Sequence, residues 1–306
     1  MRISTLSTRN FPGLGSGEFD LRAPSGKQPL VVISGAPGSG KTSLLRAIAA
    51  AKEGLYPYGP ALSLEGLAEG QAAKVSATWE FSPSEVQQFA LSKANYDTEA
   101  LWGSPVIAFP DPELQAILGA YDLRPTSPKM ELFHAERTLS PGGAYTHASL
   151  LAPLEAGLRL TTDNRKYASL KAHAVELFDA QRGGPLAAMF GRLCKSAELA
   201  SARRGPLGPE VWLRTRFGLT ELQSASATER EAFLFAATFS RGGITSSIVL
   251  VDNPERFIPR SFAATFVREL LDLGASNQII VATALDDLGA ELDGAVRIQL
   301  RASEHV

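Results

Sequence analysis

The sequence predicts an α/β fold with a mostly parallel core sheet flanked by helices, and three observations support this prediction. Short, nearly continuous apolar runs rich in β-branched residues lie near both ends of the chain, which is typical of strands buried on both faces of a parallel sheet. Segments with helical periodicity lie between them, as crossover helices would. Other segments alternate between apolar and polar residues, which indicates antiparallel strands. The apolar runs are residues 29–34 (PLVVIS), 247–252 (SIVLVD), 278–283 (QIIVAT) and 295–300 (AVRIQL).

The N-terminal part of the chain is expected to form an antiparallel β-subdomain. Its strand candidates are residues 1–6 (MRISTL), 17–21 (GEFDL) and 74–81 (KVSATWEF). A helix is predicted over residues 41–51, where Leu44, Leu45 and Ile48 share one face. A second helix with the same periodicity is predicted over residues 260–273.

The middle of the chain, from about residue 146 to residue 206, has a helical pattern without a sustained heptad repeat. Gly183, Gly184 and Pro185 divide this pattern into at least two helices. We therefore expect a helical insertion and not a long coiled-coil arm.

Composition narrows the class of protein. The chain has 306 residues, with 30 Lys and Arg against 32 Asp and Glu, so no overall positive field attracts it to nucleic acid or to an anionic membrane. The single Cys194 excludes an internal disulfide and a zinc site built from several thiolates. No apolar run approaches the roughly 18 residues that cross a bilayer, and the N-terminus lacks the pattern of a signal peptide. The sequence therefore predicts a soluble, cytoplasmic protein.

Residues 35–42 read GAPGSGKT and match G-x-x-x-x-G-K-[ST] at every fixed position, between a predicted strand and a predicted helix. Glycines allow backbone N–H groups to surround an anion, and the helix N-terminus adds partial positive charge. Lys41 is expected to contact the β- and γ-phosphates and Thr42 to bind Mg²⁺. The predicted nucleotide-binding residues of this loop are Gly35, Ala36, Pro37, Gly38, Ser39, Gly40, Lys41 and Thr42. The sequence thus predicts a P-loop NTPase that binds ATP with Mg²⁺.

A second strand, IVLVD, ends in Asp252 and has the Walker B arrangement, in which a carboxylate at the sheet edge holds Mg²⁺ through water. Thr42 and Asp252 are therefore the predicted metal residues. Lys41 and Asp252 are 211 residues apart (252 − 41) but must meet at one Mg²⁺, so residues 1–306 are expected to form a single ATPase head. Its expected parts are a β-subdomain and P-loop lobe over about 1–110, the helical insertion over about 146–206 and a C-terminal lobe over about 210–306.

Beyond these motifs, the chain resembles the RecF/SMC-like ABC-type ATPases, the AAA family ATPases of the OLD/RecF group. The order of strand, Asn-Phe turn, strand and P-loop helix over residues 1–48 is similar to the N-terminus of that group. Three short stretches are also similar: residues 252–255 (DNPE) to its Asp-Glu-Pro-Glu stretch, residues 226–230 (SATER) to its Ser-x-Gly-Glu signature, and Thr283-Ala284 to its Thr-His switch. The resemblance covers roughly residues 1–80 and 210–306.

The resemblance implies that two heads sandwich ATP, so that the signature helix of one head caps the γ-phosphate on the P-loop of the other. The assembly would be a homo- or hetero-oligomer. Ser226 would be a direct ligand and Thr228 would occupy the position of the signature glycine, which makes both residues candidate nucleotide contacts. The same stretch also fits an ordinary helix capping box, and both interpretations stay open at this point.

Two hydrolysis elements of the family are replaced in this chain. The family's catalytic base directly follows the Walker B aspartate, where this chain has Asn253, whose amide can orient water but cannot accept its proton. The switch histidine is replaced by Ala284. Glu255 could substitute for the base, although we expect it to point elsewhere as the chain leaves the strand. Asp252, Asn253 and Glu255 are therefore the candidate catalytic positions.

Two further sets of residues are left open by the sequence. Residues 130–143 resemble the strand that leads into the family's Q-loop, whose polar residue reaches Mg²⁺ and the attacking water; the candidates here are His134, Glu136 and Arg137. Arg137 could contact phosphate or pair with a carboxylate. A basic cluster could contact a polyanion or form solvated helix ends. It consists of Arg203, Arg204, Arg214 and Arg216.

These features favour an ATP-dependent engaging head, in which ATP drives dimerisation and slow or absent hydrolysis makes the closed state long-lived. The resemblance implies a DNA-related or defence-type complex with an effector or nuclease partner. An alternative is a fully active ATP hydrolase in DNA repair or recombination, in which Asn253 and Glu255 together, or a partner's residues, do the work of the base. A third interpretation is a small-molecule or nucleotide kinase, which needs no signature helix. DNA is a further candidate partner, which the near-neutral charge disfavours.

Overall fold

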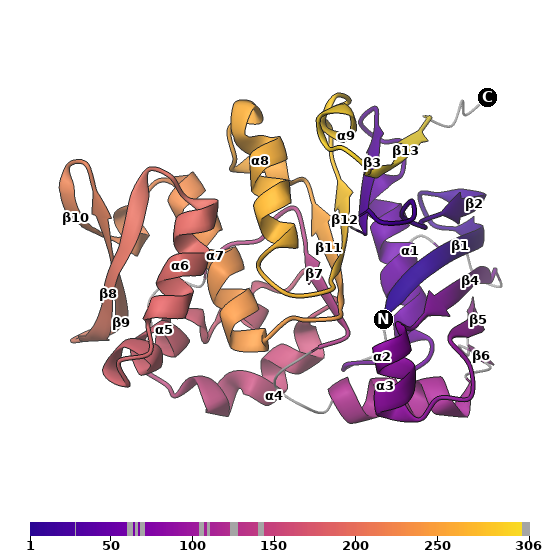
Figure 1. The fold of residues 1–306 in the computed structure, drawn as a ribbon, viewed down its shortest axis with the longest axis horizontal. Coiled ribbons are helices and arrows are strands. Elements are labelled where there is room, and N and C mark those ends of the chain that lie inside the picture. The colour runs from indigo at the N-terminus through magenta and orange to yellow at the C-terminus, as the bar shows by residue number, and fades with distance from the viewer. Residues whose placement is uncertain are drawn as a thin grey trace.

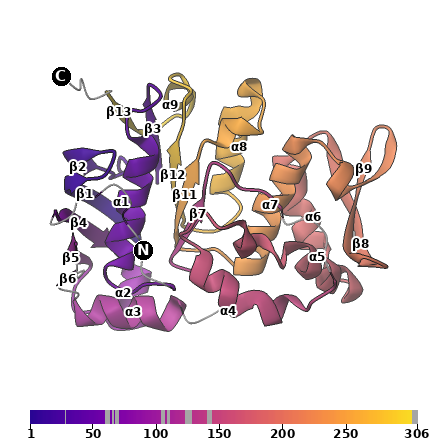
Figure 2. The ribbon, with the colours of Figure 1, turned by 180° about the vertical axis from the view of Figure 1, so that it is seen from behind.

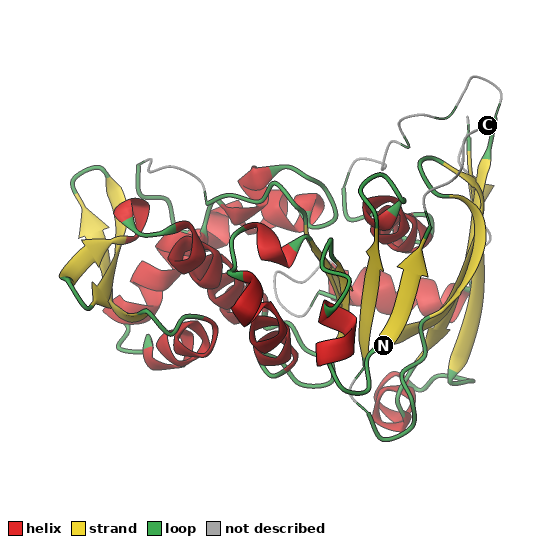
Figure 3. Cartoon of the chain, turned by 90° about the horizontal axis from the view of Figure 1, so that it is seen from above, coloured by secondary structure: helices red, strands yellow, loops and turns green. Residues whose placement is uncertain are grey.

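The computed structural model describes residues 1–27, 29–59, 64, 67, 71–103, 107–108, 111–122, 128–139 and 144–301. In this part of the chain, helices separate three sheets (Figure 1). A five-stranded antiparallel sheet and a three-stranded sheet lie at opposite ends of the molecule, and a parallel sheet lies between them (Figures 2 and 3). None of the helices described is both long enough and apolar enough to cross a membrane.

The core sheet is parallel throughout, which confirms the predicted fold class. Its strands, in spatial order, are β13 (Val296–Leu300), β3 (Leu30–Gly35), β12 (Gln278–Ala282), β11 (Ile248–Asp252) and β7 (Met130–Phe133). Successive residues face opposite sides, so that Val31 and Ile33 lie in one hydrophobic core while Leu30 and Val32 lie in the other. The apolar runs of the sequence are therefore continuous because both faces of the sheet are covered.

Different elements cover the two faces of the core sheet. Helix α1 (Lys41–Glu53) packs between one face and the antiparallel sheet, and its Leu44, Leu45 and Ile48 are buried there, as predicted. Helices α7 (Ala227–Gly242) and α8 (Arg260–Leu271) cover the other face, with the short α9 (Leu288–Glu291) after β12. The P-loop strand β3 is thus held in the middle of a layered core.

The antiparallel sheet is larger than the sequence patterns indicated. Its strands, in spatial order, are β2 (Gly15–Asp20), β1 (Arg2–Phe11), β4 (Ala73–Glu80), β5 (Asn95–Trp102) and β6 (Ile107–Ala108). Strands β2, β1 and β4 correspond to the three predicted segments. Helices α2 (Pro83–Phe89) and α3 (Pro112–Asp122) accompany the sheet.

The predicted helical insertion is helical only in its first part. Helices α4 (Ala148–Leu158), α5 (Leu170–Asp179) and α6 (Gly184–Leu193) follow one another, with the short helix η1 (Asn164–Tyr167) before α5. The prediction is wrong for the residues after α6, because β8 (Ala197–Gly205) pairs with β9 (Gly208–Thr215), which pairs with β10 (Gly218–Glu221). A β-bulge between Leu199 and Ser201 interrupts the alternation of apolar and polar residues along β8, so the sequence of this strand lacks the regular pattern of a half-buried strand.

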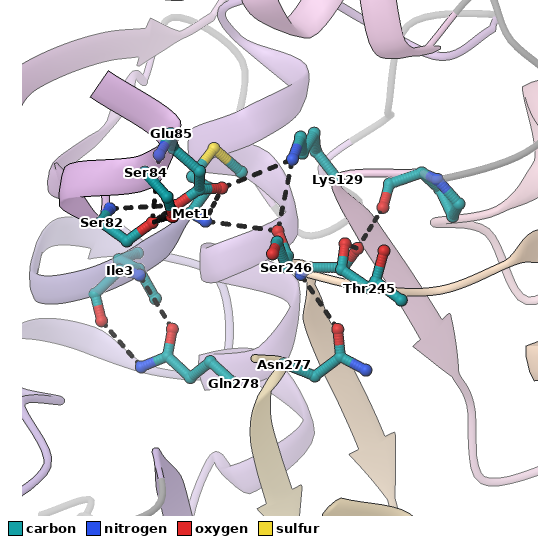
Figure 4. Close-up of polar contacts among 12 residues, drawn as sticks. Met1, Ile3, Ser82, Ser84, Glu85, Lys129, Thr245, Ser246, Asn277 and Gln278 are labelled. Carbon is teal, nitrogen blue, oxygen red and sulfur yellow. Dashed lines mark hydrogen bonds and ion pairs between the residues drawn. The ribbon is translucent and has the colours of Figure 1, made fainter. Parts of the chain in front are cut away.

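Gln278, the first residue of β12, joins the core sheet to the antiparallel sheet (Figure 4). Its Oε1 accepts a hydrogen bond from Ile3 N at 2.8 Å, and its Nε2 donates to Ile3 O at 2.9 Å. The side chain is buried, so one amide satisfies both backbone groups of Ile3 away from water. Beside it, the α-amino group of Met1 forms an ion pair with Glu85 and donates to Ser246 O at 3.3 Å (Figure 4).

We expect the substitution Gln278→Leu to lower the free energy of unfolding by about 1–3 kcal/mol for each backbone group of Ile3 that loses its partner. Unfolding in urea, followed by circular dichroism, measures this change. Gln299→Leu is a matched control, because Gln299 is an exposed glutamine in β13 and its replacement should change stability by less than about 0.5 kcal/mol. Equal losses in the two variants would contradict the role of Gln278 as a bridge.

Candidate nucleotide-binding site

The loop between β3 and α1 has the backbone conformation that phosphate binding requires. Gly35 and Gly40 have φ angles of 145° and 94°, which side-chain-bearing residues rarely adopt. A Cβ atom on Gly35 would lie 2.3 Å from Leu300 O, and one on Gly40 would lie 2.7 Å from Gly13 O. Only glycine fits at these two positions, and the loop can therefore turn its N–H groups toward an anion.

Lys41 and Ser39 place polar atoms inside this loop. Lys41 Nζ donates to Gly35 O at 2.7 Å and to Ala36 O at 2.8 Å, so the ammonium group lies over the loop that would hold the phosphates. Ser39 Oγ is buried and has no hydrogen-bond partner among the described residues. A buried hydroxyl without a partner at the centre of an anion-binding loop fits a ligand that supplies the missing acceptor.

The two predicted metal residues meet at the edge of the core sheet. Thr42 Oγ1 donates to Asp252 Oδ2 at 2.9 Å, although the two residues are 210 positions apart. Asp252 ends β11 and its carboxyl group is buried, which raises its pKa, while the hydrogen bond from Thr42 and the charge of Arg137 oppose this rise. A hydroxyl and a carboxylate beside a phosphate loop are the oxygen ligands that Mg²⁺ prefers, so the residues fit this ion.

Arg137 is buried beneath this edge, where it joins three elements. Its guanidinium forms an ion pair with Glu231 of α7, and Nη1 donates to Asp252 O at 2.7 Å and to His134 O at 2.9 Å. Nη2 also lies 3.4 Å from Asn253 O. Of the two roles that the sequence left open for Arg137, the structure shows the pairing with a carboxylate.

His134 and Glu136, the other two Q-loop candidates, line a cavity of about 440 Å³ together with Thr42 and Asp252. Burial, together with the charges of Lys166 and Arg137, lowers the pKa of His134 to about 3, so the imidazole is neutral at physiological pH. Neither ring nitrogen makes a hydrogen bond of normal geometry within the described residues. These two residues, and not Arg137, are therefore placed to reach a ligand beside the metal position.

The turn after Asp252 places Glu255 where the sequence did not predict it. Asn253 adopts a left-handed conformation (φ 51°, ψ 63°), and the helical turn η3 (Pro254–Arg256) follows directly. Glu255 Oε1 then accepts hydrogen bonds from Thr283 Oγ1 at 2.9 Å and from Ala284 N at 2.5 Å. The reversal at Asn253 thus directs Glu255 back to the end of β12, whereas the sequence led us to expect that the chain leaving β11 would carry it elsewhere.

Ser226 and Thr228 lie at the N-terminus of α7, and the hydrogen bonds of their side chains go to residues outside the P-loop. Ser226 Oγ accepts from Glu229 N at 3.2 Å, and Ser226 N donates to Glu229 Oε2 at 2.8 Å, which forms a complete capping box. Thr228 Oγ1 donates to Phe257 O at 2.7 Å. The structure therefore contains the capping box, and Ser226 is exposed at the N-terminus of α7.

Two contributors to the site were not predicted from the sequence. Glu231 supports Arg137 from α7, and Arg256 donates from Nη1 to Ala135 O at 2.8 Å, which ties the turn after Asp252 to the segment after β7. An acidic residue on the buried side of the apolar helix EAFLFAATF was the available signal for Glu231. No sequence pattern pointed to Arg256.

A cluster of buried charges lies behind the cavity wall. Lys166 Nζ donates to Leu132 O at 2.5 Å and to Thr161 O at 2.8 Å, and so holds the segment that lines the cavity. Burial raises the pKa of Glu131 to about 7, partly opposed by Lys166 and Arg159. Burial likewise lowers the pKa of Lys166 to about 8. Other charged members of the cluster are Glu155 and Arg241.

This cluster predicts a pH dependence of stability. The pKa of Glu131 is higher in the folded state than the ordinary value of 4.5, so the folded state binds more protons and the free energy of unfolding should fall as pH rises from about 4.5 to about 7. Glu131→Gln should flatten this part of the profile by up to about 3 kcal/mol. Urea unfolding at several pH values measures it, with the exposed strand residue Glu198→Gln as control. Parallel profiles for Glu131→Gln and the wild type would contradict the prediction.

Comparison with known proteins gives a likeness of fold. No protein-family model and no curated protein matches the sequence. The structure of an Smc head bound to the C-winged helix domain of ScpA aligns at 17% identity over 96% of this chain and 92% of that chain, with a TM-score of 0.57. The Smc head with an extended coiled coil bound to the C-terminal domain of ScpA, from Pyrococcus furiosus, aligns at 16% identity over 98% and 94%, with a TM-score of 0.53. The chain therefore has the fold of an SMC head domain, the ABC-type fold of P-loop NTPases.

Proposed function

We propose that the chain is an ATP-binding head that engages a second head when ATP is bound. The observation that carries this proposal is the hydrogen bond between Thr42 and Asp252 beside the glycine loop, over which the ammonium group of Lys41 lies. These residues stand on the fold of an SMC head. The loop would hold the β- and γ-phosphates, and Thr42 and Asp252 would hold Mg²⁺, which neutralises phosphate charge when bound. A single copy contains both a P-loop and an exposed helix N-terminus at Ser226, so two copies could complement one another.

Slow hydrolysis is part of the proposal. Asn253 stands directly after the Walker B aspartate and Ala284 stands at the switch position, so neither position has a group that accepts a proton. Turnover should be well below the roughly 1 to 10³ s⁻¹ of an ordinary enzyme. Steady-state phosphate release measures this rate, and brisk turnover by the purified chain would favour the alternative of a fully active hydrolase.

The role of Ser226 can be separated from helix capping by two substitutions. Ser226→Ala removes the cap and should cost about 1 kcal/mol of stability. Ser226→Asp keeps a good cap but places a negative charge where the γ-phosphate of the opposite head would bind, so it should keep stability and lose ATP-induced dimerisation. Thermal unfolding and light scattering with ATP and Mg²⁺ measure the two effects. Normal dimerisation of Ser226→Asp would leave Ser226 as a helix cap alone.

We also propose that the head works in the cytoplasm with an effector or nuclease partner in a DNA-related or defence-type complex. The likeness to Smc heads bound to ScpA domains supports a partner-binding head, and the buried, unpaired Cys194 fits a reducing compartment. Affinity purification from the native host tests for the partner. Salt-dependent retardation of duplex DNA in the presence of ATP tests whether the head itself contacts DNA.

A further inference from the structure

Glu255 lies between the ends of two neighbouring strands of the core sheet. It follows β11 by three residues, yet its Oε1 accepts hydrogen bonds from Thr283 Oγ1 and Ala284 N, directly after β12. Asp252 and Ala282 are register partners in these parallel strands, so Asp252 and the Thr283 hydroxyl lie at the same edge of the sheet. The carboxylate of Glu255 is thus held at the edge where Thr42 meets Asp252.

This position is fixed by contacts on both sides of the turn. Asn253 N donates to Ala282 O at 2.8 Å, which ties the start of the turn to β12. Arg137 donates to Asp252 O from below, and Arg256 donates to Ala135 O on the β7 side. The turn is therefore anchored to the end of β12 on one side and to the segment after β7 on the other. The side chain of Glu255 is oriented by donors that occupy one of its oxygens.

The second carboxylate oxygen of Glu255, Oε2, could accept a further hydrogen bond. Glu255 Oε2 is buried and has no hydrogen-bond partner among the residues that the structure describes. A buried carboxylate oxygen without a partner costs free energy, and a ligand or a bound water at the site would remove that cost.

We propose that Glu255 is the carboxylate that accepts the proton of the attacking water during the slow hydrolysis of ATP by this chain. In this step the water oxygen forms a bond to the γ-phosphorus, and the bond between the γ-phosphorus and the β,γ-bridging oxygen breaks. The electron pair of the broken bond stays on the leaving ADP. The proton of the water passes to Glu255 Oε2, and phosphate and ADP are the products. The proposal rests on the proposed function and assigns to Glu255 the task that Asn253 cannot perform.

The test compares variants of the full chain in single-turnover hydrolysis of radiolabelled ATP, with ATP affinity and thermal stability measured on the same samples. Glu255→Gln keeps an acceptor for Thr283 and Ala284 N, so it should fold and bind ATP as the wild type does. Its hydrolysis rate should fall by about 10²-fold or more. Thr283→Val removes the hydroxyl that orients Glu255 and that also accepts a hydrogen bond from Leu285 N at 3.0 Å, and it should give an intermediate loss. The exposed Glu291→Gln, on α9, should leave the rate unchanged.

The outcomes separate this proposal from the function on which it rests. Wild-type ATP affinity with a much slower rate in Glu255→Gln supports the proposal. A rate in Glu255→Gln equal to that of the wild type would overturn it, and so would a wild-type chain that binds ATP but hydrolyses it no faster than Lys41→Ala. Failure of the folded wild type to bind ATP would instead overturn the proposed function as well.

Discussion

The substitution Arg137→Met should destabilise the fold by about 3–5 kcal/mol, because it leaves Glu231 as a buried carboxylate without its cation. Arg137 is fully buried, and its guanidinium also donates to Asp252 O and His134 O. Three separate segments therefore lose hydrogen bonds in this variant. Urea unfolding measures the loss of stability.

A double variant separates the buried charge from the lost packing. Arg137→Met with Glu231→Leu removes both charges and should recover much of the stability, since apolar residues of similar volume can replace a buried ion pair. The double variant still lacks the donor to Asp252 O, so its affinity for ATP with Mg²⁺ should stay reduced. Arg256→Met is the matched control, because Arg256 is exposed and, within the described part of the chain, its side chain donates one hydrogen bond, to Ala135 O. A loss in Arg256→Met as large as in Arg137→Met would contradict the account.

Lys41→Ala should reduce the affinity for ATP by at least about 100-fold, because it removes the ammonium group that lies over the phosphate loop. The loop itself is shaped by its glycines, so the fold should be retained. Isothermal titration calorimetry with ATP and Mg²⁺ measures the affinity, and circular dichroism checks the fold.

The control for this variant is Lys27→Ala, which removes a different lysine near the core sheet. Lys27 is exposed and pairs with Asp293 at 2.7 Å on the surface, where an ion pair contributes little to stability. Its loss should leave ATP affinity unchanged. Undiminished ATP binding by Lys41→Ala would mean that nucleotide does not bind at this loop.

The sequence predicted the parts of the fold whose patterns are local. The parallel strands could be identified because burial on both faces requires continuous apolar runs, as in SIVLVD. The P-loop could be identified because its glycines and Lys41 form a contiguous motif. Strand β8 was not predicted, because its bulge breaks the alternation of apolar and polar residues. It also directly follows several helices and ends in exposed arginines, so its sequence was assigned to the helical segment.

The parts of the site that the sequence could not predict depend on tertiary contacts or on one backbone torsion. Arg137 and Glu231 are 94 residues apart, and no spacing rule connects them. The direction of Glu255 depends on the positive φ of Asn253, a conformation that asparagine adopts more readily than most residues. An asparagine at this position permits a left-handed turn but does not require one, so the sequence alone did not give the direction of Glu255.

We expect ATP to join two copies of this head. Light scattering coupled to size-exclusion chromatography, with and without ATP and Mg²⁺, tests it most directly, with Lys41→Ala analysed beside the wild type. The mass of the wild type should double when ATP and Mg²⁺ are added, while Lys41→Ala should keep the mass of a single chain. A wild-type mass that stays that of one chain, although calorimetry shows ATP to be bound, would contradict it.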